Sequence, residues 1–446
     1  MDPTLEMARI HRICGDWDPW EKHAYIKRVV GMTLEARGPS ARVGQLCRLL
    51  EEGGTGEETM AEVVGFTDNT TVLLPLSELH GVRAGTRVQI TPGTFRVPVG
   101  MELRGRIIDG LGRPIDGGPT LDLRDRRDIV ARPPHPLSRM RVHEPLELGI
   151  RVIDGLLTCG RGQRVGIFAG SGVGKSTLMG MIARSSDADV NVIGLIGERG
   201  REVRDFIEDQ LGPDGLAKSV VVVATSDQPP LLRIKAAQVA TTIAEYYRDG
   251  GWDVSLMMDS VTRFAMAQRE VGLAAGEPPT TRGYPPSVFS SLSQLLERAG
   301  NSDRGTMTAF YSVLVEGDDM DEPITDAVRS ILDGHIQLSR SLAEENHYPA
   351  VDVLRSVSRL MVDITDEEHR SAAAALKGLL AAYEDARDLI SIGAYQRGAD
   401  PKVDSALDML PRIRALLRQE SRERTPLEDT RGSLLDLFPN REVQRH

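Results

Sequence analysis

The stretch VGIFAGSGVGKST, residues 165–177, decides the fold of this chain. It begins as a short apolar run, the pattern of a strand buried on both faces, and then becomes a glycine-rich loop. Gly170, Gly172 and Gly174 allow the backbone to curl so that successive N–H groups converge on one anion. A helix that follows would point its positive end at the same anion. Strand, loop and helix in this order predict a phosphate-binding P-loop.

The residue types within this loop have separate expected tasks. Lys175 would reach the β- and γ-phosphates of a nucleoside triphosphate, and the Ser176 hydroxyl would bind Mg²⁺. Ala169 stands at the first position of the pattern, where glycine is usual, and is an accepted variant. The alternative, a glycine-rich turn that binds nothing, is disfavoured by the flanking strand and helix patterns. The predicted nucleotide-binding residues of the loop are Ala169, Gly170, Ser171, Gly172, Val173, Gly174, Lys175, Ser176 and Thr177.

Strand and helix patterns alternate on the C-terminal side of the loop. Short apolar runs occur at 190–196, 219–224 and 254–258, and helical patterns lie between them at 201–211 and 232–248. This alternation predicts a parallel sheet covered by helices, an α/β nucleotide-binding core. The turn-rich segment GRIIDGLGRPIDGG, which precedes the core, is expected to be a linker.

Four segments follow from changes in pattern along the chain. Short alternating runs punctuated by Gly, Asn and Thr predict a small β-barrel at 25–95, and an amphipathic leader at 1–24 precedes it. The leader is either a packed helix or a docking helix for a partner. The nucleotide-binding core is expected at 96–369 and a helical domain at 370–446, whose last 25 residues are rich in charge and are expected to be loosely ordered.

Two acidic residues follow buried strands of the predicted core. Asp259 comes directly after the run VSLMM, at the carboxyl end of a strand, where open α/β sheets bind ligands. Glu198 follows the run VNVIGLI at the equivalent end of another strand. Taken singly, Asp259 would be read as a helix cap and Glu198 as a solvated loop charge. Together with the P-loop they predict a magnesium-organising acid and a carboxylate that polarises the attacking water.

Composition excludes several classes of protein. The net charge of −11 argues against a protein that coats nucleic acid, because phosphate binding requires a basic surface. The three cysteines, Cys14, Cys47 and Cys159, are too far apart for a zinc site or a disulfide framework, which fits a reducing compartment. The sequence contains no long apolar run and no signal-peptide pattern at its start, so we expect a soluble, cytoplasmic protein that is able to associate peripherally with a membrane machine.

Five motifs together resemble one known family. The chain is similar to the hexameric ATPases of the rotary ATP synthase type, and most similar to the flagellar branch of the type III protein-export ATPases. The resemblance covers most of the chain up to about residue 400, and in that family the order is β-barrel, RecA-like nucleotide domain and helical domain. The motifs are AGSGVGKST (169–177), GERGRE (197–202), MMDSVTRFA (257–265), GEPPTTRGYPPSVF (276–289) and YPAVDVLRSVSRLM (348–361).

The resemblance implies roles for individual residues. Glu198 falls on the family's catalytic glutamate with Arg199 beside it, and Glu202 on the acid near the magnesium waters. Asp259 falls on the Walker B aspartate, and Tyr348 on the aromatic residue that packs against adenine.

Arg359 falls on the arginine finger, which in such rings reaches the γ-phosphate bound to a neighbouring subunit. A planar, permanently charged guanidinium suits that role. The alternative is a local ion pair with Asp352 or Asp363.

The resemblance also implies a cofactor and partners. Mg²⁺ with ATP is the expected cofactor and substrate pair, and a hexameric ring of identical subunits is the expected assembly. Further expected partners are a dimeric peripheral regulator bound by the N-terminal extension, a coiled-coil stalk protein, export chaperones carrying cargo, and the export gate at the membrane.

Alternative members of the wider family are separated by particular residues. A virulence-type secretion ATPase is the main alternative, although the amino-acid sequence of the P-loop favours the flagellar branch. A non-catalytic synthase subunit would have glutamine where Glu198 stands, and a catalytic synthase subunit would have a different, acidic C-terminal turn. A terminator-type RNA helicase would need an aromatic, basic face on its barrel, whereas this barrel segment has few aromatic residues, Tyr25 and Phe66 among them.

Overall fold

A computed structural model of the chain describes residues 23–38, 41–50, 59–79, 81–91, 93–315, 317 and 319–439. The chain divides into two compact units, Met1–Phe95 with Val271–Glu277, and Arg96–Glu270 with Pro278–His446. The expected leader, residues 1–24, lies outside the described residues except for His23 and Ala24, which begin the first strand. Among the described residues, no helix combines the length and the apolar character that crossing a bilayer requires.

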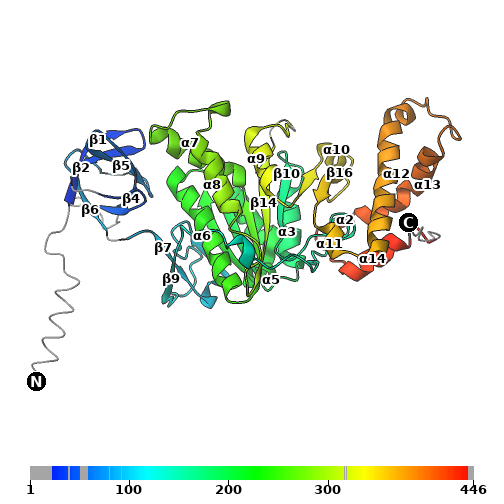
Figure 1. The fold of residues 1–446 in the computed structure, drawn as a ribbon, viewed down its shortest axis with the longest axis horizontal. Helices are drawn as coiled ribbons and strands as arrows, with labels where there is room; N and C mark the ends of the chain where they lie inside the picture. The colour runs from blue at the N-terminus through cyan, green and yellow to red at the C-terminus, as the bar shows by residue number, and fades with distance from the viewer. Residues whose placement is uncertain are drawn as a thin grey trace, which may run out of the picture. The chain divides into compact units, whose positions relative to one another are not determined.

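The first unit is a closed β-barrel with strand order β1-β2-β5-β4-β3-β6 (Figure 1). Side chains alternate between the barrel interior and its surface, and Ile26, Leu34, Val63 and Leu73 fill the interior. Asp68 and Asn69, both with positive φ, form the two-residue turn between β4 and β5, the turn that suits a twisted hairpin. The strands are β1 His23–Val30, β2 Thr33–Arg37, β3 Leu46–Leu50, β4 Thr59–Thr67, β5 Thr70–Pro75 and β6 Arg87–Ile90.

The second unit contains an eight-stranded sheet in the order β16-β15-β10-β14-β13-β11-β12-β8. Every neighbouring pair is parallel except β15 and β16. The four apolar runs predicted as buried strands are confirmed as β10 to β13. The strands are β8 Arg106–Asp109, β10 Arg164–Ala169, β11 Val190–Glu198, β12 Ser219–Thr225, β13 Asp253–Asp259, β14 Thr306–Leu314, β15 Gly334–Leu338 and β16 Val351–Ser358.

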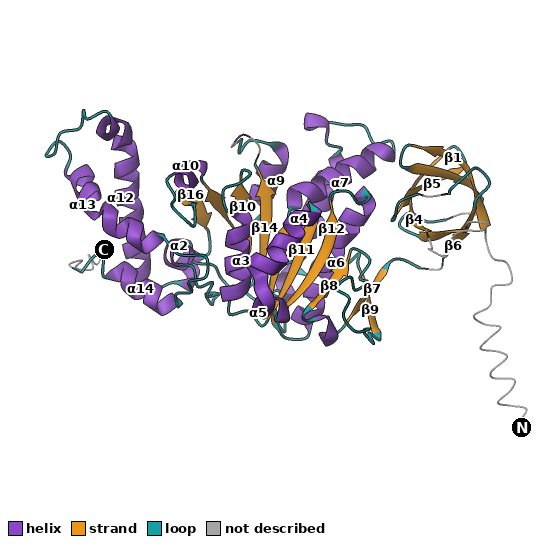
Figure 2. Cartoon of the chain, turned by 180° about the vertical axis from the view of Figure 1, so that it is seen from behind, coloured by secondary structure: helices purple, strands orange, loops and turns teal. Residues whose placement is uncertain are grey.

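Helices cover both faces of this sheet (Figures 1 and 2). Helices α6 and α8 lie on one face, and α3, α4 and α5 lie on the other. The helices of the core are α2 Arg151–Leu156, α3 Lys175–Ser185, α4 Gly200–Asp205, the π-helical turn η3 Phe206–Leu211, α5 Gly212–Ala217, α6 Pro230–Asp249, α7 Val261–Ala274, α8 Pro286–Leu296, α9 Pro323–Ile331, α10 Arg340–Glu344 and α11 Met361–Ile364. A separate two-stranded ribbon pairs β7 Arg96–Val99 with β9 Asp125–Asp128, and short 3₁₀ turns occur at η1 Met101–Leu103, η2 Pro136–Ser138 and η4 Thr281–Gly283.

The segment GRIIDGLGRPIDGG is not a linker, and this expectation was wrong. Its residues Arg106–Asp109 form β8, which pairs in parallel with β12 and is the outermost strand on one side of the eight-stranded sheet. The turn after β8 is held by the Asp109 carboxylate, which accepts hydrogen bonds from the N–H groups of Leu111 and Arg113 at 2.9 and 2.8 Å. The strand was hidden because only Ile107 and Ile108 are apolar in it.

Three helices form the C-terminal part of the second unit: α12 Glu367–Ser391, α13 Pro401–Leu417 and α14 Leu427–Leu435. The N-cap of the first is Asp366, whose side chain accepts a 2.8 Å hydrogen bond from the N–H of His369.

The expectation that the last 25 residues are loosely ordered was wrong for those described, because α14 packs against α2 and buries Leu434 completely. Ion pairs from Arg424 to Glu147 and from Arg431 to Asp366, each at 2.8 Å, hold the same segment. Charge-rich composition concealed an amphipathic helix.

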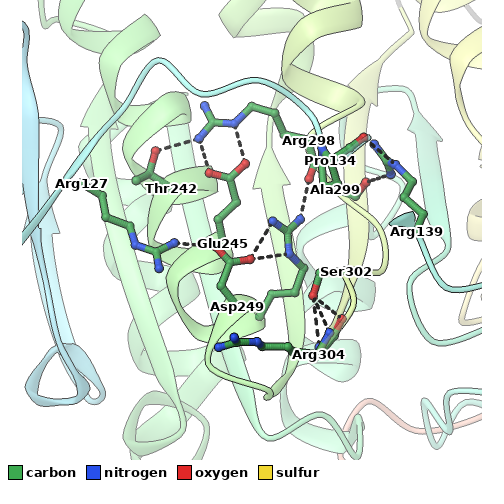
Figure 3. A network of polar contacts seen from close by, with 12 residues as sticks. Arg127, Pro134, Arg139, Thr242, Glu245, Asp249, Arg298, Ala299, Ser302 and Arg304 are labelled. Atoms are coloured by element: carbon green, nitrogen blue, oxygen red, sulfur yellow. Dashed lines mark hydrogen bonds and ion pairs between the residues drawn. The ribbon is translucent and has the colours of Figure 1, made fainter. Parts of the chain in front are cut away.

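A buried polar network attaches the segment after β9 to α6 and α8 (Figure 3). The Arg298 guanidinium pairs with both oxygens of Glu245 at 2.8 and 2.6 Å, and it also donates to the Thr242 hydroxyl and to the Ile129 carbonyl. Arg298 and Glu245 are 3% and 5% exposed. Removing either partner would leave the other charge buried and unpaired, which costs about 3–5 kcal/mol.

Candidate nucleotide-hydrolysis site

The glycine-rich loop connects β10 to α3 as the sequence predicts. Strand β10 ends at Ala169, and α3 begins at Lys175. Gly172 and Gly174 have φ values of 79° and 96°, in the left-handed region that side chains disfavour, so glycine is required there. Gly174 directly precedes α3, and the N–H groups of the first helical turn therefore face the end of this loop.

Lys175 lies between the two carboxylates that the sequence singled out. Its ammonium group hydrogen-bonds to Oδ1 of Asp259 and lies 3.7 Å from Oε1 of Glu198. Asp259 ends β13 and Glu198 ends β11. The parallel sheet therefore brings both to the same edge as the P-loop, the edge where the carboxyl ends of the parallel strands lie. Burial acts to lower the pKa of Lys175, but the carboxylates of Asp259 and Glu198 outweigh it, and the pKa is raised. Lys175 is therefore held charged.

Asp259 is a buried, firmly held acid. It is 3% exposed, and its Oδ1 accepts a 2.6 Å hydrogen bond from the Ser312 hydroxyl on β14. Ser176 follows Lys175 in the first turn of α3 and is exposed. The helix-cap alternative for Asp259 is not what the geometry shows, because its carboxylate points to Lys175 and Ser312.

Glu198 has the electrostatic environment expected of a proton acceptor. Burial, followed by the nearby charge of Asp259, raises the pKa of its carboxyl to about 7. Its Oε1 is buried and accepts no hydrogen bond from the described residues. Glu202, in the first turn of α4, has a lowered pKa because its carboxylate accepts a hydrogen bond from the protonated Glu198 carboxyl, and it also pairs with Arg199 at 3.3 Å. A carboxyl that titrates near pH 7 is well matched to general-base work.

Tyr348 lies beside the P-loop and borders a cavity of about 600 Å³. A Cβ placed on Gly174 would lie 3.6 Å from the Tyr348 ring, so the two are neighbours. The segment after α13 also lines this cavity, and the sequence analysis missed it because its polar residues are typical of a solvated segment. These wall residues are Arg418, Gln419, Glu420, Ser421 and Glu423.

Arg359 lies at the opposite edge of the sheet from the P-loop, where the amino ends of the parallel strands lie. Its backbone N–H donates to the carbonyl of Asp333 at 3.1 Å. The Asp333 carboxylate in turn pairs with Arg164, the first residue of β10. The P-loop leaves β10 after its sixth residue, about 16–20 Å away along the strand. That distance exceeds the reach of an arginine side chain, so Arg359 does not reach its own chain's P-loop.

The side chain of Arg359 has no ion-pair partner among the described residues. It is exposed, while Asp352 lies 3.6 Å from Arg355 instead. No ion pair joins it to Asp363 within the described ranges either. The local pairings considered from sequence are therefore not those of this structure.

The residues present fit a magnesium-bound nucleoside triphosphate. Among the described residues, His, Cys, Asp and Glu side chains form no group of three or more that would hold a metal alone. A magnesium ion here would take phosphate and water ligands, as P-loop sites do, together with the hydroxyl of Ser176. The buried Oε1 of Glu198 accepts no hydrogen bond from the described residues, although the Lys175 ammonium lies 3.7 Å away, and it therefore suits a polar ligand such as the attacking water.

A parallel sheet with a P-loop, two acids at the carboxyl ends of neighbouring strands, a preceding β-barrel and following helices define a RecA-like P-loop ATPase. Comparison with protein families agrees. Residues 26–92 match the β-barrel domain of the ATP synthase alpha/beta family, residues 149–358 its nucleotide-binding domain, and residues 365–436 the C-terminal domain of the type III secretion ATPase EscN.

The chain belongs to the type III secretion ATPases of the ATP synthase alpha/beta family, and it is an ATP-hydrolysing enzyme. It is 51% identical to a flagellum-specific ATP synthase of Bacillus subtilis, over 95% of this chain and 97% of the relative. It is also 51% identical to a type 3 secretion system ATPase of Xanthomonas euvesicatoria, over 92% of each chain. The assembled ATPase EscN of enteropathogenic E. coli superposes with a TM-score of 0.88 at 48% identity, covering 93% of this chain and 99% of EscN.

Proposed function

We propose that this chain hydrolyses Mg-ATP as a ring of identical subunits, and that hydrolysis drives or primes protein export through a flagellar type III apparatus. One observation carries the ring: Arg359 is exposed, unpaired among the described residues, and too far from its own P-loop to act there. A second subunit is the natural source of the phosphate that such an arginine would bind. The solved structure of assembled EscN, which matches over almost its whole length, supports this assembly.

Within one subunit, each residue has a defined proposed task. The loop residues 169–177 and Lys175 bind and orient the triphosphate, and Tyr348 stacks on the base. Ser176, Asp259 and Glu202 would hold Mg²⁺, which would stabilise the negative charge of the phosphates.

Glu198 accepts a proton from the attacking water, and its buried position keeps its pKa near the working pH. In its protonated form Glu198 donates a hydrogen bond to the Glu202 carboxylate, and Arg199 pairs with Glu202 and limits its movement. Arg359 of the adjacent subunit completes the site by stabilising charge on the transferred phosphate.

The flagellar branch is favoured, although identity alone does not separate the branches, since it is 51% to a relative of each. The P-loop wording and the segments around Glu198 support the flagellar assignment. Disrupting the gene in a motile host should abolish secretion of filament subunits and swimming. Loss of effector secretion with swimming intact would instead support the virulence branch.

The proposed partners follow from the same family. EscN has been solved in complex with its central stalk EscO, which supports a coiled-coil stalk partner for this chain. We further assign the leader 1–24 to a dimeric regulator, and export chaperones with cargo and the membrane export gate to the working assembly in the cytoplasm.

The most direct test of the ring is specific ATPase activity against protein concentration, with sedimentation in parallel. Activity per subunit should rise as rings form, because each site needs two subunits. Full activity from monomers at every concentration would overturn the shared-site proposal.

A further inference from the structure

Gln419 is buried in the wall of the cavity beside Tyr348, and its side-chain amide and backbone N–H are all paired. It is 5% exposed. Its Oε1 accepts from the N–H of Arg151 at 2.8 Å, and its Nε2 donates to the carbonyls of Gly149 and Glu423 at 2.7 and 2.9 Å. Its own backbone N–H donates to the carbonyl of Tyr348 at 2.9 Å. A single residue therefore connects three separate segments of the chain.

These contacts place Gln419 where the C-terminal helices meet the nucleotide-binding core. It lies two residues after the end of α13, and Leu417, the last residue of that helix, is buried in the core. Gly149 and Arg151 stand at the start of α2, on the core side. A rotation of α13 would therefore move the residue that holds the carbonyl of Tyr348.

We infer that Gln419 is a positioning residue for nucleotide binding: it holds the connector between α13 and α14 against the core and so fixes Tyr348 for stacking on the base. The inference deepens the proposed function and rests on it, since it assumes that the base binds at Tyr348. The Gln419 side chain is not assigned to the phosphates, because its oxygen and nitrogen are already bonded to Arg151, Gly149 and Glu423.

Tyr348 depends on an external anchor because its ring projects into the cavity and is partly exposed. The residue is 41% exposed. On either side of it, the N–H of His347 bonds to the carbonyl of Leu342 at 2.9 Å, and the carbonyl of Ala350 accepts from Ser339 at 2.8 Å. At Tyr348 itself the backbone anchor is Gln419. An aromatic ring contributes to base binding only while its plane is held in the stacking geometry.

The test replaces Gln419 with methionine, which keeps the length of the side chain and removes its hydrogen bonds. The KM for ATP should rise about tenfold while kcat changes less than about threefold, because loss of positioning weakens binding but leaves Lys175 and Glu198 intact. The affinity for ADP, measured by calorimetry, should fall by a similar factor. Gln396→Met, at an exposed position, is the matched control and should leave both constants unchanged.

A double-mutant cycle with Tyr348→Ala separates positioning from a general structural effect. If Gln419 acts through Tyr348, the double variant should bind ATP no more than about twofold worse than Tyr348→Ala alone. Losses that multiply would overturn the inference. Should Gln419→Met not fold, as thermal unfolding without nucleotide would show, Gln419→Glu serves in the same cycle. It keeps the acceptor for Arg151 and sets a carboxylate against the carbonyls of Gly149 and Glu423.

The outcomes distinguish this inference from the proposal on which it rests. If Tyr348→Ala leaves the KM unchanged, base stacking at Tyr348 is wrong, and the inference fails with it. If Tyr348→Ala raises the KM and Gln419→Met does not, only the role of Gln419 is wrong. A fall in kcat at unchanged KM for Gln419→Met would also overturn it.

Discussion

Lys175 and Arg359, at opposite edges of the eight-stranded sheet, are held in opposite ways. At the carboxyl-end edge, Lys175, Asp259 and Glu198 are largely buried and lie against one another. At the other edge, Arg359 has a fixed backbone but an exposed side chain with no acid partner in the described ranges. The charge of Lys175 is paired within the subunit, whereas the side chain of Arg359 has no acid partner among the described residues.

This difference teaches where pairing is needed within a subunit and where it is not. A buried charge must be paired in the subunit itself, because desolvation is costly. An exposed guanidinium is stable alone in water and is available for a phosphate that arrives with another subunit. The following predictions test each edge, starting with the largest expected effect.

At the carboxyl-end edge, Lys175→Ala and Glu198→Gln should each lower kcat by roughly 10³-fold or more. The two variants should differ in binding. Loss of Lys175 removes a phosphate contact and should weaken Mg-ATP affinity, whereas Glu198→Gln keeps the shape of the site and should bind normally. Steady-state kinetics and calorimetry measure the two effects. A Glu198→Gln enzyme with more than about a tenth of the normal kcat would exclude Glu198 as the base.

At the opposite edge, Arg359→Ala should lower kcat by about 10³-fold without unfolding the protein, because the side chain is exposed. Arg355→Ala, at a nearby exposed arginine that pairs with Asp352, is the matched control. An equally large loss in the control would show that this edge acts through general charge.

Mixing Arg359→Ala with Glu198→Ala subunits tests whether the two edges meet across an interface. With random equal mixing, about a quarter of interfaces combine an intact Glu198 with an intact Arg359, so some activity should return. Each variant mixed with itself gives the baseline. Absence of recovery would argue for action within one subunit, once doping with wild-type subunits has excluded strictly sequential firing.

The raised pKa of Glu198 predicts a smaller effect, on the pH dependence of turnover. Glu198 accepts a proton only when ionised, and its pKa of about 7 means that the ionised fraction falls as the pH is lowered through 7. The rate should therefore drop about tenfold between pH 8 and pH 6. Sedimentation at both pH values controls for loss of the ring. A profile that is flat, or that rises toward pH 6, contradicts this assignment.

The smallest predicted effect concerns Ser358, which helps to hold the backbone at Arg359. The Ser358 hydroxyl donates to the carbonyl of Thr158 at 2.7 Å and accepts from Gln163 at 3.2 Å. Ser358→Ala should loosen the backbone under Arg359 and lower kcat about threefold to tenfold. Ser330→Ala, at an exposed helical serine, should have no effect. An unchanged rate for Ser358→Ala would show that the strand alone positions the arginine.

Much of the core was predictable from local sequence, because strand, P-loop and helix patterns are encoded by neighbouring residues. The runs that became β10 to β13 were long enough and apolar enough to identify, and Asp259 and Glu198 follow two of them directly. Their convergence with Lys175 also followed from the parallel sheet, since carboxyl ends of parallel strands share one edge.

The features that sequence missed depend on contacts between distant segments. Strand β8 is only four residues long and is recognisable only through its pairing with β12. The wall at Gln419 and the helix α14 are polar or charge-rich segments whose partners, Gly149, Arg151 and Glu147, lie more than 250 residues earlier. No local pattern carries such information, because hydrophobic periodicity does not register a buried amide.

The buried pair between Arg298 and Glu245 has a consequence for how this chain is able to diverge. Replacing either residue alone leaves an unpaired charge in the interior, whereas exchanging both for apolar residues of similar volume leaves none and costs less than either single change. The two positions, separated by 53 residues in sequence, should therefore covary. Among descendants of this gene, we expect them to be kept together or lost together, with the single replacements purged.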